Sequence, residues 1–238
     1  MRSEDNRTPE DVLHSLQKDP HHQGAWYLDP DNANSYESFY EGKYKEADLL
    51  EKAALHRLLS RFEGVKDILD EGCGTGHFTR WYESLGYHVV GADVSPVMLG
   101  VARKLWSGEL HLAPAEHLPF PDRSFDLLSM ITCTEYMPDL GAVLREAHRI
   151  ARRGILMGVM NKWSLPTVRR IVQVKLGKNP YYTNATFRSL ATIKGLARQN
   201  FAKGSYRLYW TCTAFPKLLS LRVARFPFGA FLAVAIEF

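Results

Sequence analysis

The chain has 238 residues, of which 45% are hydrophobic and 24% charged, and this balance excludes a wholly disordered, collagen-like or coiled-coil protein. No apolar run reaches the roughly 18 residues that suggest a membrane span, and the polar N-terminus shows no secretory signal. The net charge of +4 conceals an asymmetry, because residues 1–139 carry 24 acidic and 13 basic side chains whereas residues 140–238 carry 2 and 17. The basic half either forms solvated helix surfaces or attracts an anionic substrate, a nucleic acid or an anionic membrane.

The N-terminal part of the chain divides into two segments. Residues 1–32 are polar, contain three prolines and show no sustained periodicity, so we predict a flexible tail with a short helix near residues 9–17. Residues 33–62 are rich in helix formers and carry apolar residues at three- and four-residue spacing, which predicts an amphipathic helix.

From residue 65 onward short apolar strands alternate with helices. The predicted strands are residues 65–70, 87–93, 109–112, 125–133 and 155–160, with helices at 78–85, from 95 onward and at 138–152. Two further helices, 163–176 and 186–201, and two late strands, 206–213 and 228–238, follow. This alternation is typical of an α/β fold in which helices cover both faces of a mostly parallel sheet. No linker divides it, so we predict a single domain over residues 33–238.

The strongest local signal is a glycine-rich turn after the first predicted strand, where residues 68–76 read ILDEGCGTG. Glycines at every second position let the backbone turn tightly against a ligand, and the next helix points its positive N-terminus there. The spacing differs from that of dinucleotide-binding turns, and no Lys-Ser or Lys-Thr follows as in phosphate-binding loops. Asp70 stands at the strand end, where it would repel a pyrophosphate. The pattern favours a ligand with a cationic amino group.

This turn closely resembles the first motif of class I S-adenosylmethionine-dependent methyltransferases, with Glu71 where the motif usually has leucine. Residues 91–99 (GADVSPVML) resemble the second-strand motif, and residues 115–126 (AEHLPFPDRSFD) resemble a motif of the small-molecule, methyltransferase type 11-like branch. The resemblance implies a Rossmann-like sheet of seven strands, mostly parallel, with the last strand antiparallel. It also implies that residues 33–62 form an N-terminal helix or lid, residues 63–160 a cofactor-binding core, and residues 161–238 the substrate side with the last two strands.

The resemblance further implies which residues bind S-adenosylmethionine. Asp70 and the glycine turn would hold the methionine part, and Asp93 would accept both ribose hydroxyls. The implied cofactor-binding residues are Asp70, Gly72, Cys73, Gly74, Gly76, Asp93, Val94, Met98, Ala115, Glu116, Thr132 and Cys133. Pro114 stands where the family often has an aspartate that binds the adenine amino group, so a backbone carbonyl, Glu116 or water must replace that contact.

The acceptor site is less marked in the sequence. A sulfonium methyl group is already activated, so the protein mainly positions the acceptor for in-line displacement, and a base is needed only if the acceptor must lose a proton. Glu135 and Tyr136, which follow the fourth predicted strand, are the candidate catalytic residues. The candidate substrate-binding residues are Tyr36 and Tyr40 on the N-terminal helix and Asn161 and Trp163 after the fifth predicted strand.

Together these features predict an enzyme that transfers a methyl group from S-adenosylmethionine to a small molecule. Large aromatic residues and the basic stretch 162–178 favour an acceptor that is hydrophobic and anionic. The alternatives are a nucleic-acid or protein methyltransferase that uses the basic half, and a protein that binds the cofactor without turnover. Enzymes that methylate the amino groups of nucleic acids usually carry the tetrapeptide Asp/Asn-Pro-Pro-Tyr/Phe after the fourth strand. This chain lacks it there, which disfavours a nucleic-acid substrate. Three scattered cysteines predict a reduced, cytoplasmic protein without a metal site.

Overall fold

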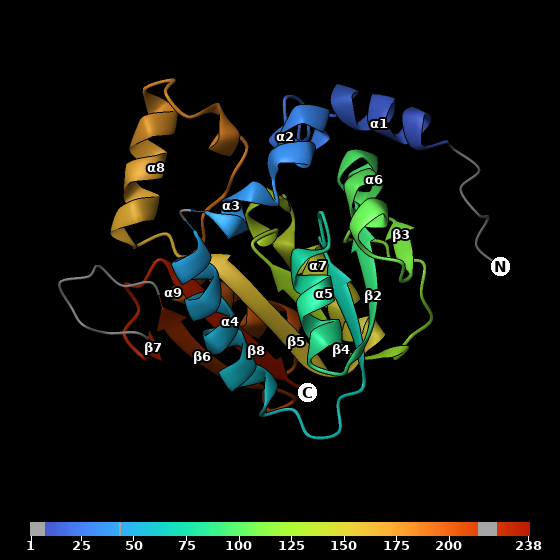
Figure 1. The fold of residues 1–238 in the computed structure, drawn as a ribbon. Helices are drawn as coiled ribbons and strands as arrows, with labels where there is room; N and C mark the ends of the chain where they lie inside the picture. The colour runs from blue at the N-terminus through green and yellow to red at the C-terminus, as the bar shows by residue number, and fades with distance from the viewer. Residues whose placement is uncertain (1–7, 43, 214–222) are drawn as a thin grey trace.

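The fold is built around one central sheet (Figure 1). The computed structural model describes residues 8–42, 44–213 and 223–238. Within them the strands are β1 (Asp67–Glu71), β2 (His88–Asp93), β3 (Leu110–Leu112), β4 (Phe125–Ile131), β5 (Ala151–Met160), β6 (Arg207–Thr213), β7 (Val223–Ala224) and β8 (Phe231–Glu237). They lie in the order β3-β2-β1-β4-β5-β8-β6-β7. β1 to β5 run parallel, and β8 lies antiparallel between β5 and β6.

Helices cover both faces of this sheet (Figure 1). The helices of the described residues are α1 (Pro9–Lys18), α2 (Pro30–Ser35), α3 (Ser38–Glu41), α4 (Lys45–Leu59), α5 (His77–Ser84), α6 (Pro96–Leu105), α7 (Leu140–Ile150), α8 (Leu165–Lys175) and α9 (Leu190–Asn200), with short 3-10 turns η1 (Trp26–Leu28), η2 (Thr134–Tyr136) and η3 (Pro180–Tyr182). Successive strand residues face opposite sides, so Leu127 packs with α4 and α5 whereas Leu128 packs with α7 and α9. The sheet therefore has a core on each face.

The predicted Rossmann-like architecture is confirmed, with its mostly parallel sheet and antiparallel last strand. The two-residue β7 is an addition at the sheet edge that the sequence pattern did not predict. β5 also begins earlier than predicted and runs through Gly154. A side chain at Gly154 would come within 2.2 Å of the carbonyl oxygen of Ile236, so this glycine permits close pairing with β8 rather than ending α7.

The N-terminal region differs most from its prediction. Residues 8–32, expected as part of a flexible tail, contain α1, η1 and the start of α2, whereas residues 1–7 lie outside the described residues. Pro9 and Pro30 occupy first helical turns, where a missing N–H costs nothing, and Thr8 and Asp29 cap the two helices. Tyr27 and its apolar neighbours are buried against α6. Apolar burial therefore outweighs the polar composition of this segment.

The predicted helix over residues 33–62 is interrupted. It divides into the end of α2, then α3 and α4, with a break at Gly42, whose ψ of −120° lies outside the helical region. The division into an N-terminal tail and one domain over residues 33–238 stays a prediction. Among the residues placed by the structure, no helix combines the length and apolarity needed to cross a bilayer.

Candidate active site

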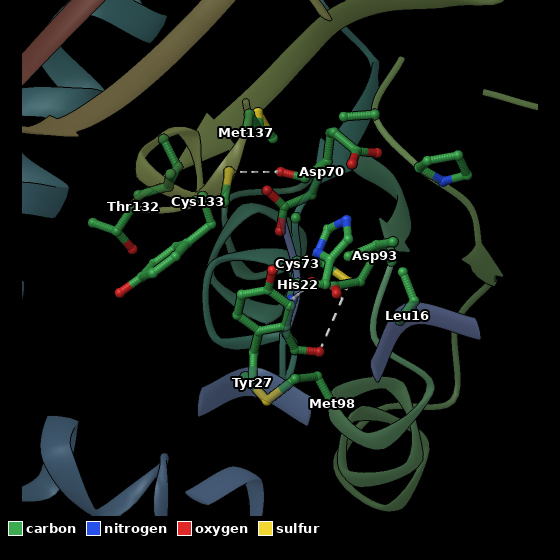
Figure 2. Close-up of a pocket in the computed structure, with 18 of the residues that line it drawn as sticks. Leu16, His22, Tyr27, Asp70, Cys73, Asp93, Met98, Thr132, Cys133 and Met137 are labelled. Carbon is green, nitrogen blue, oxygen red and sulfur yellow. Dashed lines mark hydrogen bonds between the residues drawn. The ribbon is translucent and has the colours of Figure 1, made fainter. Parts of the chain in front are cut away.

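A cavity of about 480 Å³ lies where β1, β2 and β4 end (Figure 2). We call it the central cavity. Every residue that the resemblance assigned to the cofactor lines it except Gly76, which instead precedes α5 as its N-cap. Thr132, Cys133 and Met137 lie on one side of the cavity and Leu16 on another (Figure 2). The carboxyl ends of parallel strands are the usual ligand site of open α/β sheets.

The glycine turn is packed directly against the end of β4. Gly72 has φ of +69°, and a Cβ there would lie 2.5 Å from the Cβ of Cys133, so both conformation and space require glycine. The Cys133 thiol donates to the carbonyl oxygen of Glu71 at 3.3 Å. Thr132 has φ of +54°, a costly conformation for a β-branched residue, and its N–H donates to Gly158 at 2.7 Å. Two tightly constrained segments therefore form the floor of the cavity.

Asp93 connects the glycine turn with the end of β2. Its Oδ2 accepts the N–H of Gly74 at 2.8 Å, and its Oδ1 accepts the N–H of Ser95 at 2.8 Å. Burial raises the pKa of Asp93 to about 6, although these hydrogen bonds oppose the shift. Asp93 is therefore both a structural tie and a hydrogen-bond acceptor at the cavity wall.

The central cavity is acidic. Its acidic lining residues are Asp19, Asp70, Glu71, Asp93, Glu116 and Asp139, and no lysine or arginine of the described chain lines it. The Thr79 hydroxyl donates to Asp70 at 2.7 Å, and burial raises the pKa of Asp70 to about 7. Glu71 is 2% exposed, and its Oε2 receives no hydrogen bond from the described residues. Burial and the nearby carboxylates hold the Glu71 pKa well above its usual range. Such a cavity suits a cationic ligand.

The N-terminal segment forms a wall that the sequence did not predict. His22, Trp26 and Tyr27 line the cavity, and the Ser95 hydroxyl donates to the Tyr27 carbonyl oxygen at 2.6 Å. The ring of Trp26 stacks on that of Tyr181, with centroids 4.3 Å apart. The adjacent aromatic residues at positions 26 and 27 were the signal in the sequence, since a flexible tail seldom carries large apolar rings.

Tyr36 and Tyr40, two of the candidate substrate-binding residues, line the cavity, and their hydroxyl oxygens lie 3.2 Å apart. The Tyr40 ring stacks on His77 with centroids 3.6 Å apart. His77 Nε2 lies 2.8 Å from Asp48 Oδ1, so that nitrogen is already engaged. Tyr136, one of the candidate catalytic residues, also lines the cavity. These rings form an aromatic wall.

Glu37 fastens α3 to the glycine turn and α5. Its carboxylate accepts the Thr75 hydroxyl, and its Oε2 lies 2.7 Å from Nη2 of Arg80. Arg80 also donates to the carbonyl oxygen of Thr75 at 2.8 Å. The aromatic wall is thus tied to the segment that forms the cavity floor.

Three of the predicted catalytic and substrate-binding residues also lie outside the central cavity. Glu135 is buried and accepts the N–H of Met160 at 2.6 Å. Asn161 donates its side-chain amide to the carbonyl oxygens of Pro227 and Gly229 at 2.8 and 2.9 Å, which holds the loop before β8. Trp163 is 58% exposed on the outer surface. None of the basic residues of the stretch 162–178 belongs to the described lining either.

Comparison with known proteins agrees with this geometry. The methyltransferase domain family matches residues 69–157. A malonyl-(acyl-carrier protein) O-methyltransferase of Hamiltonella defensa is 32% identical over 183 residues, covering 75% of this chain and 69% of that protein. The enzyme of the same name from Yersinia pestis is 35% identical over 127 residues, and the alignment covers 51% of this chain and 48% of that protein.

Solved structures share the fold. A methyltransferase of Thermotoga maritima, named as a possible histamine N-methyltransferase, superposes with a TM-score of 0.72 at 25% identity, covering 89% of this chain and 98% of that chain. Magnesium protoporphyrin IX methyltransferase from Synechocystis has a TM-score of 0.63 at 15% identity, covering 95% and 99% of the two chains. The fold, the glycine turn and the relatives agree, and the chain belongs to the class I methyltransferases, enzymes that use S-adenosylmethionine as methyl donor.

Proposed function

We propose that the central cavity binds S-adenosylmethionine through the residues that the sequence motifs indicated. The acidic lining supports this, because the sulfonium and ammonium groups of the ligand outweigh its one carboxylate and the described lining holds no lysine or arginine to oppose them. Asp70 and Gly72 would hold the methionine part, and Asp93 the ribose hydroxyls. Val94 and Met98 would pack on the adenine, with Ala115 and Glu116 at its edge. When bound, the cofactor supplies a methyl group already activated for displacement.

The acceptor in this proposal is a small, mainly apolar molecule with an anionic oxygen such as a carboxylate. The observation that carries it is the Tyr36–Tyr40 pair, whose hydroxyl oxygens lie 3.2 Å apart and need only one proton between them. Burial raises the pKa of Tyr36 to about 12 and that of Tyr40 well above 10, so both phenols stay neutral. The second hydroxyl proton can then serve an anionic oxygen, with Thr132 as a further hydrogen-bond partner of Tyr36.

The lack of a suitable base in the cavity also favours an anionic oxygen as the acceptor. Glu135 lies outside the described lining, and burial raises the pKa of Tyr136, which makes that phenol a hydrogen-bond donor rather than a base at neutral pH. A carboxylate acceptor has no proton to lose, so positioning in line with the methyl group suffices. The names of the Hamiltonella and Yersinia relatives, which are O-methyltransferases of a malonyl group, support an anionic oxygen acceptor.

A panel of carboxylic acids with apolar bodies, each paired with its primary amide and amine, tests the proposal. Mass spectrometry should detect methyl esters from the acids with isotopically labelled S-adenosylmethionine. Tyr40→Phe should lower kcat/KM for the best acid about tenfold, the loss of one hydrogen bond to a charged group, about 1.4 kcal/mol. Tyr206→Phe, at a ring that packs on Phe201 beside α9, should leave it unchanged. Methylation of the amines alone would contradict the proposal.

We also propose that residues 33–238 act as a single methyltransferase domain in the cytoplasm. All three cysteines, Cys73, Cys133 and Cys212, are free thiols, which suits a reducing compartment. The acceptor experiment described above does not depend on the domain boundaries or on the compartment.

A further inference from the structure

The helix α8 exposes an apolar stripe. Leu165, Val168, Val172 and Leu176 follow one another at three- and four-residue spacing and are 71%, 42%, 49% and 62% exposed. Residues at this spacing share one face of a helix, so the stripe runs the length of α8. Trp163, just before the helix, is also exposed. α8 projects from the edge of the molecule, away from the sheet (Figure 1).

The inner face of the same helix mixes polar and apolar side chains, with Ile171 and Val174 half-buried on it. Ser164 and Thr167 are fully buried, and their hydroxyl oxygens lie 2.9 Å apart. Arg170, which is half-buried, lies over the ring of Tyr182 with its guanidinium carbon 5.4 Å from the ring centroid. An ordinary surface helix buries its apolar side and exposes its polar side. α8 instead carries apolar side chains on its outer face as well as on its inner one, and a contiguous exposed apolar surface of this kind marks an interaction site.

Basic residues border the stripe. The 3.6-residue repeat places Arg169 on one side of it and Lys175 on the other, and Lys162 and Lys178 lie near its two ends. All four are exposed. No aspartate or glutamate occurs between residues 147 and 236, so no acidic side chain of this part of the chain offsets their charge. The surface therefore combines apolar area with positive charge.

A second exposed apolar segment adjoins the start of α8. The loop before β8 carries Phe226 and Phe228, which are 44% and 51% exposed with ring centroids 5.1 Å apart. Asn161 donates to the carbonyl oxygens of Pro227 and Gly229, which fixes this loop beside the residue that begins the turn into α8. A second exposed apolar pair therefore lies on a loop that is anchored close in sequence to the start of α8.

We propose that α8 and the adjoining loop bind the surface of an anionic phospholipid bilayer. The apolar stripe would enter the boundary between head groups and acyl chains, while Arg169 and Lys175 reach the phosphates on either side. Trp163 suits the same depth, with Nζ of Lys162 5.5 Å from its ring centroid. Charge of one sign on both flanks matches a uniformly anionic fluid surface, whereas a protein interface usually pairs both signs. This binding is independent of the proposed acceptor.

Co-sedimentation of the full chain with vesicles tests the proposal. Binding should be at least tenfold stronger to phosphatidylcholine vesicles containing about one third phosphatidylglycerol than to phosphatidylcholine alone, and should weaken with salt. The double variant Leu165→Ser, Val172→Ser should lose at least tenfold in binding, as should Arg169→Gln, Lys175→Gln. The matched control is Leu105→Ser, an exposed leucine of α6, which should bind as the original chain does.

Each outcome of this experiment decides the proposal. All substituted side chains are exposed, so unchanged melting temperatures are expected and show that the variants fold. Equal binding of the stripe variants and the original chain would overturn the assignment of α8. So would failure to bind the anionic vesicles, whether the stripe then binds an isolated acidic carrier protein, forms a dimer in light scattering or binds neither.

Discussion

Asp93 is the residue on which cofactor affinity should depend most. Its two oxygens hold the backbone of Gly74 and Ser95 and would also accept the ribose hydroxyls. Asp93→Ala should therefore weaken S-adenosylmethionine binding about ten- to a hundredfold, since unpaired buried hydroxyls cost about 1–3 kcal/mol. Isothermal titration calorimetry measures this change. Asp122→Ala, at a carboxylate whose side chain is 75% exposed, is the control, and unchanged affinity in Asp93→Ala would remove this residue from the site.

Gly72 illustrates a second constraint at the residue scale. Gly72→Ala combines a left-handed backbone with a Cβ 2.5 Å from that of Cys133, whereas at Gly86, with φ of +91°, a Cβ would have no atom within 4 Å. We expect Gly86→Ala to cost about 1 kcal/mol from the backbone alone. Gly72→Ala should cost about 1–3 kcal/mol more because of overpacking. Urea unfolding compares the two, and equal losses would mean that the floor of the cavity relaxes without cost.

At the scale of secondary-structure elements, Glu37 joins α3 to the glycine turn and α5 through its hydrogen bonds with Thr75 and Arg80, which we call the Glu37 clasp. Glu37→Gln removes the charge from both hydrogen bonds while keeping the shape of the side chain. We expect cofactor release about fivefold faster, a loss of about 1 kcal/mol for a partly exposed ion pair. Stopped-flow displacement measures the rate.

The matched control for this clasp is Glu41→Gln, on the exposed last residue of α3. It changes the net charge of the same helix by the same amount and should leave the release rate unaltered. If both variants release the cofactor equally fast, general charge near the cavity and not the Glu37 contact controls release.

At the scale of the whole molecule, the buried carboxylates make stability depend on pH. Burial raises the pKa values of Asp70 and Asp93 to about 7 and about 6 in the folded protein, so folding favours their protonated forms. The stability that they contribute is complete below about pH 4 and is lost as the pH rises through about 6 to 7. The melting temperature of the ligand-free protein should therefore fall by several degrees between pH 5 and pH 8.

Two further carboxylates, those of Asp126 and Glu146, determine how stability changes at acidic pH. Although burial opposes the shift, hydrogen bonds from Lys66 N–H and Arg152 lower the pKa of Asp126, and those from Arg149 and Leu118 N–H lower that of Glu146. Stability from these two is lost as the pH falls below about 4, so the maximum should lie near pH 5. Glu71→Gln should raise the melting temperature more at pH 8 than at pH 5, because it removes a buried carboxylate without a described hydrogen bond to Oε2. A flat profile in differential scanning fluorimetry would contradict this account.

The sequence by itself determined the sheet and much of the cavity floor. Strand and helix periods along residues 65–160 follow from local burial, since each buried strand needs an apolar run and each covering helix an apolar stripe. The glycine turn could be predicted for the same reason, because a tight turn depends on residues adjacent in the chain. Most of the cavity lining at the ends of β1 and β2, including Gly72 and Asp93, was therefore predictable without knowledge of long-range contacts.

Only the tertiary structure decided the walls of the cavity and the surface of the molecule. Trp26 and Tyr27 close the site through contacts with residues far along the chain, and Asn161 is directed to a loop before β8 rather than to the cavity. The sequence predicted a helix over residues 163–176, but not that Leu165, Val168 and Val172 on it are exposed. Periodicity fixes the spacing of side chains on a helix, whereas the direction in which they point depends on what the rest of the chain packs against it.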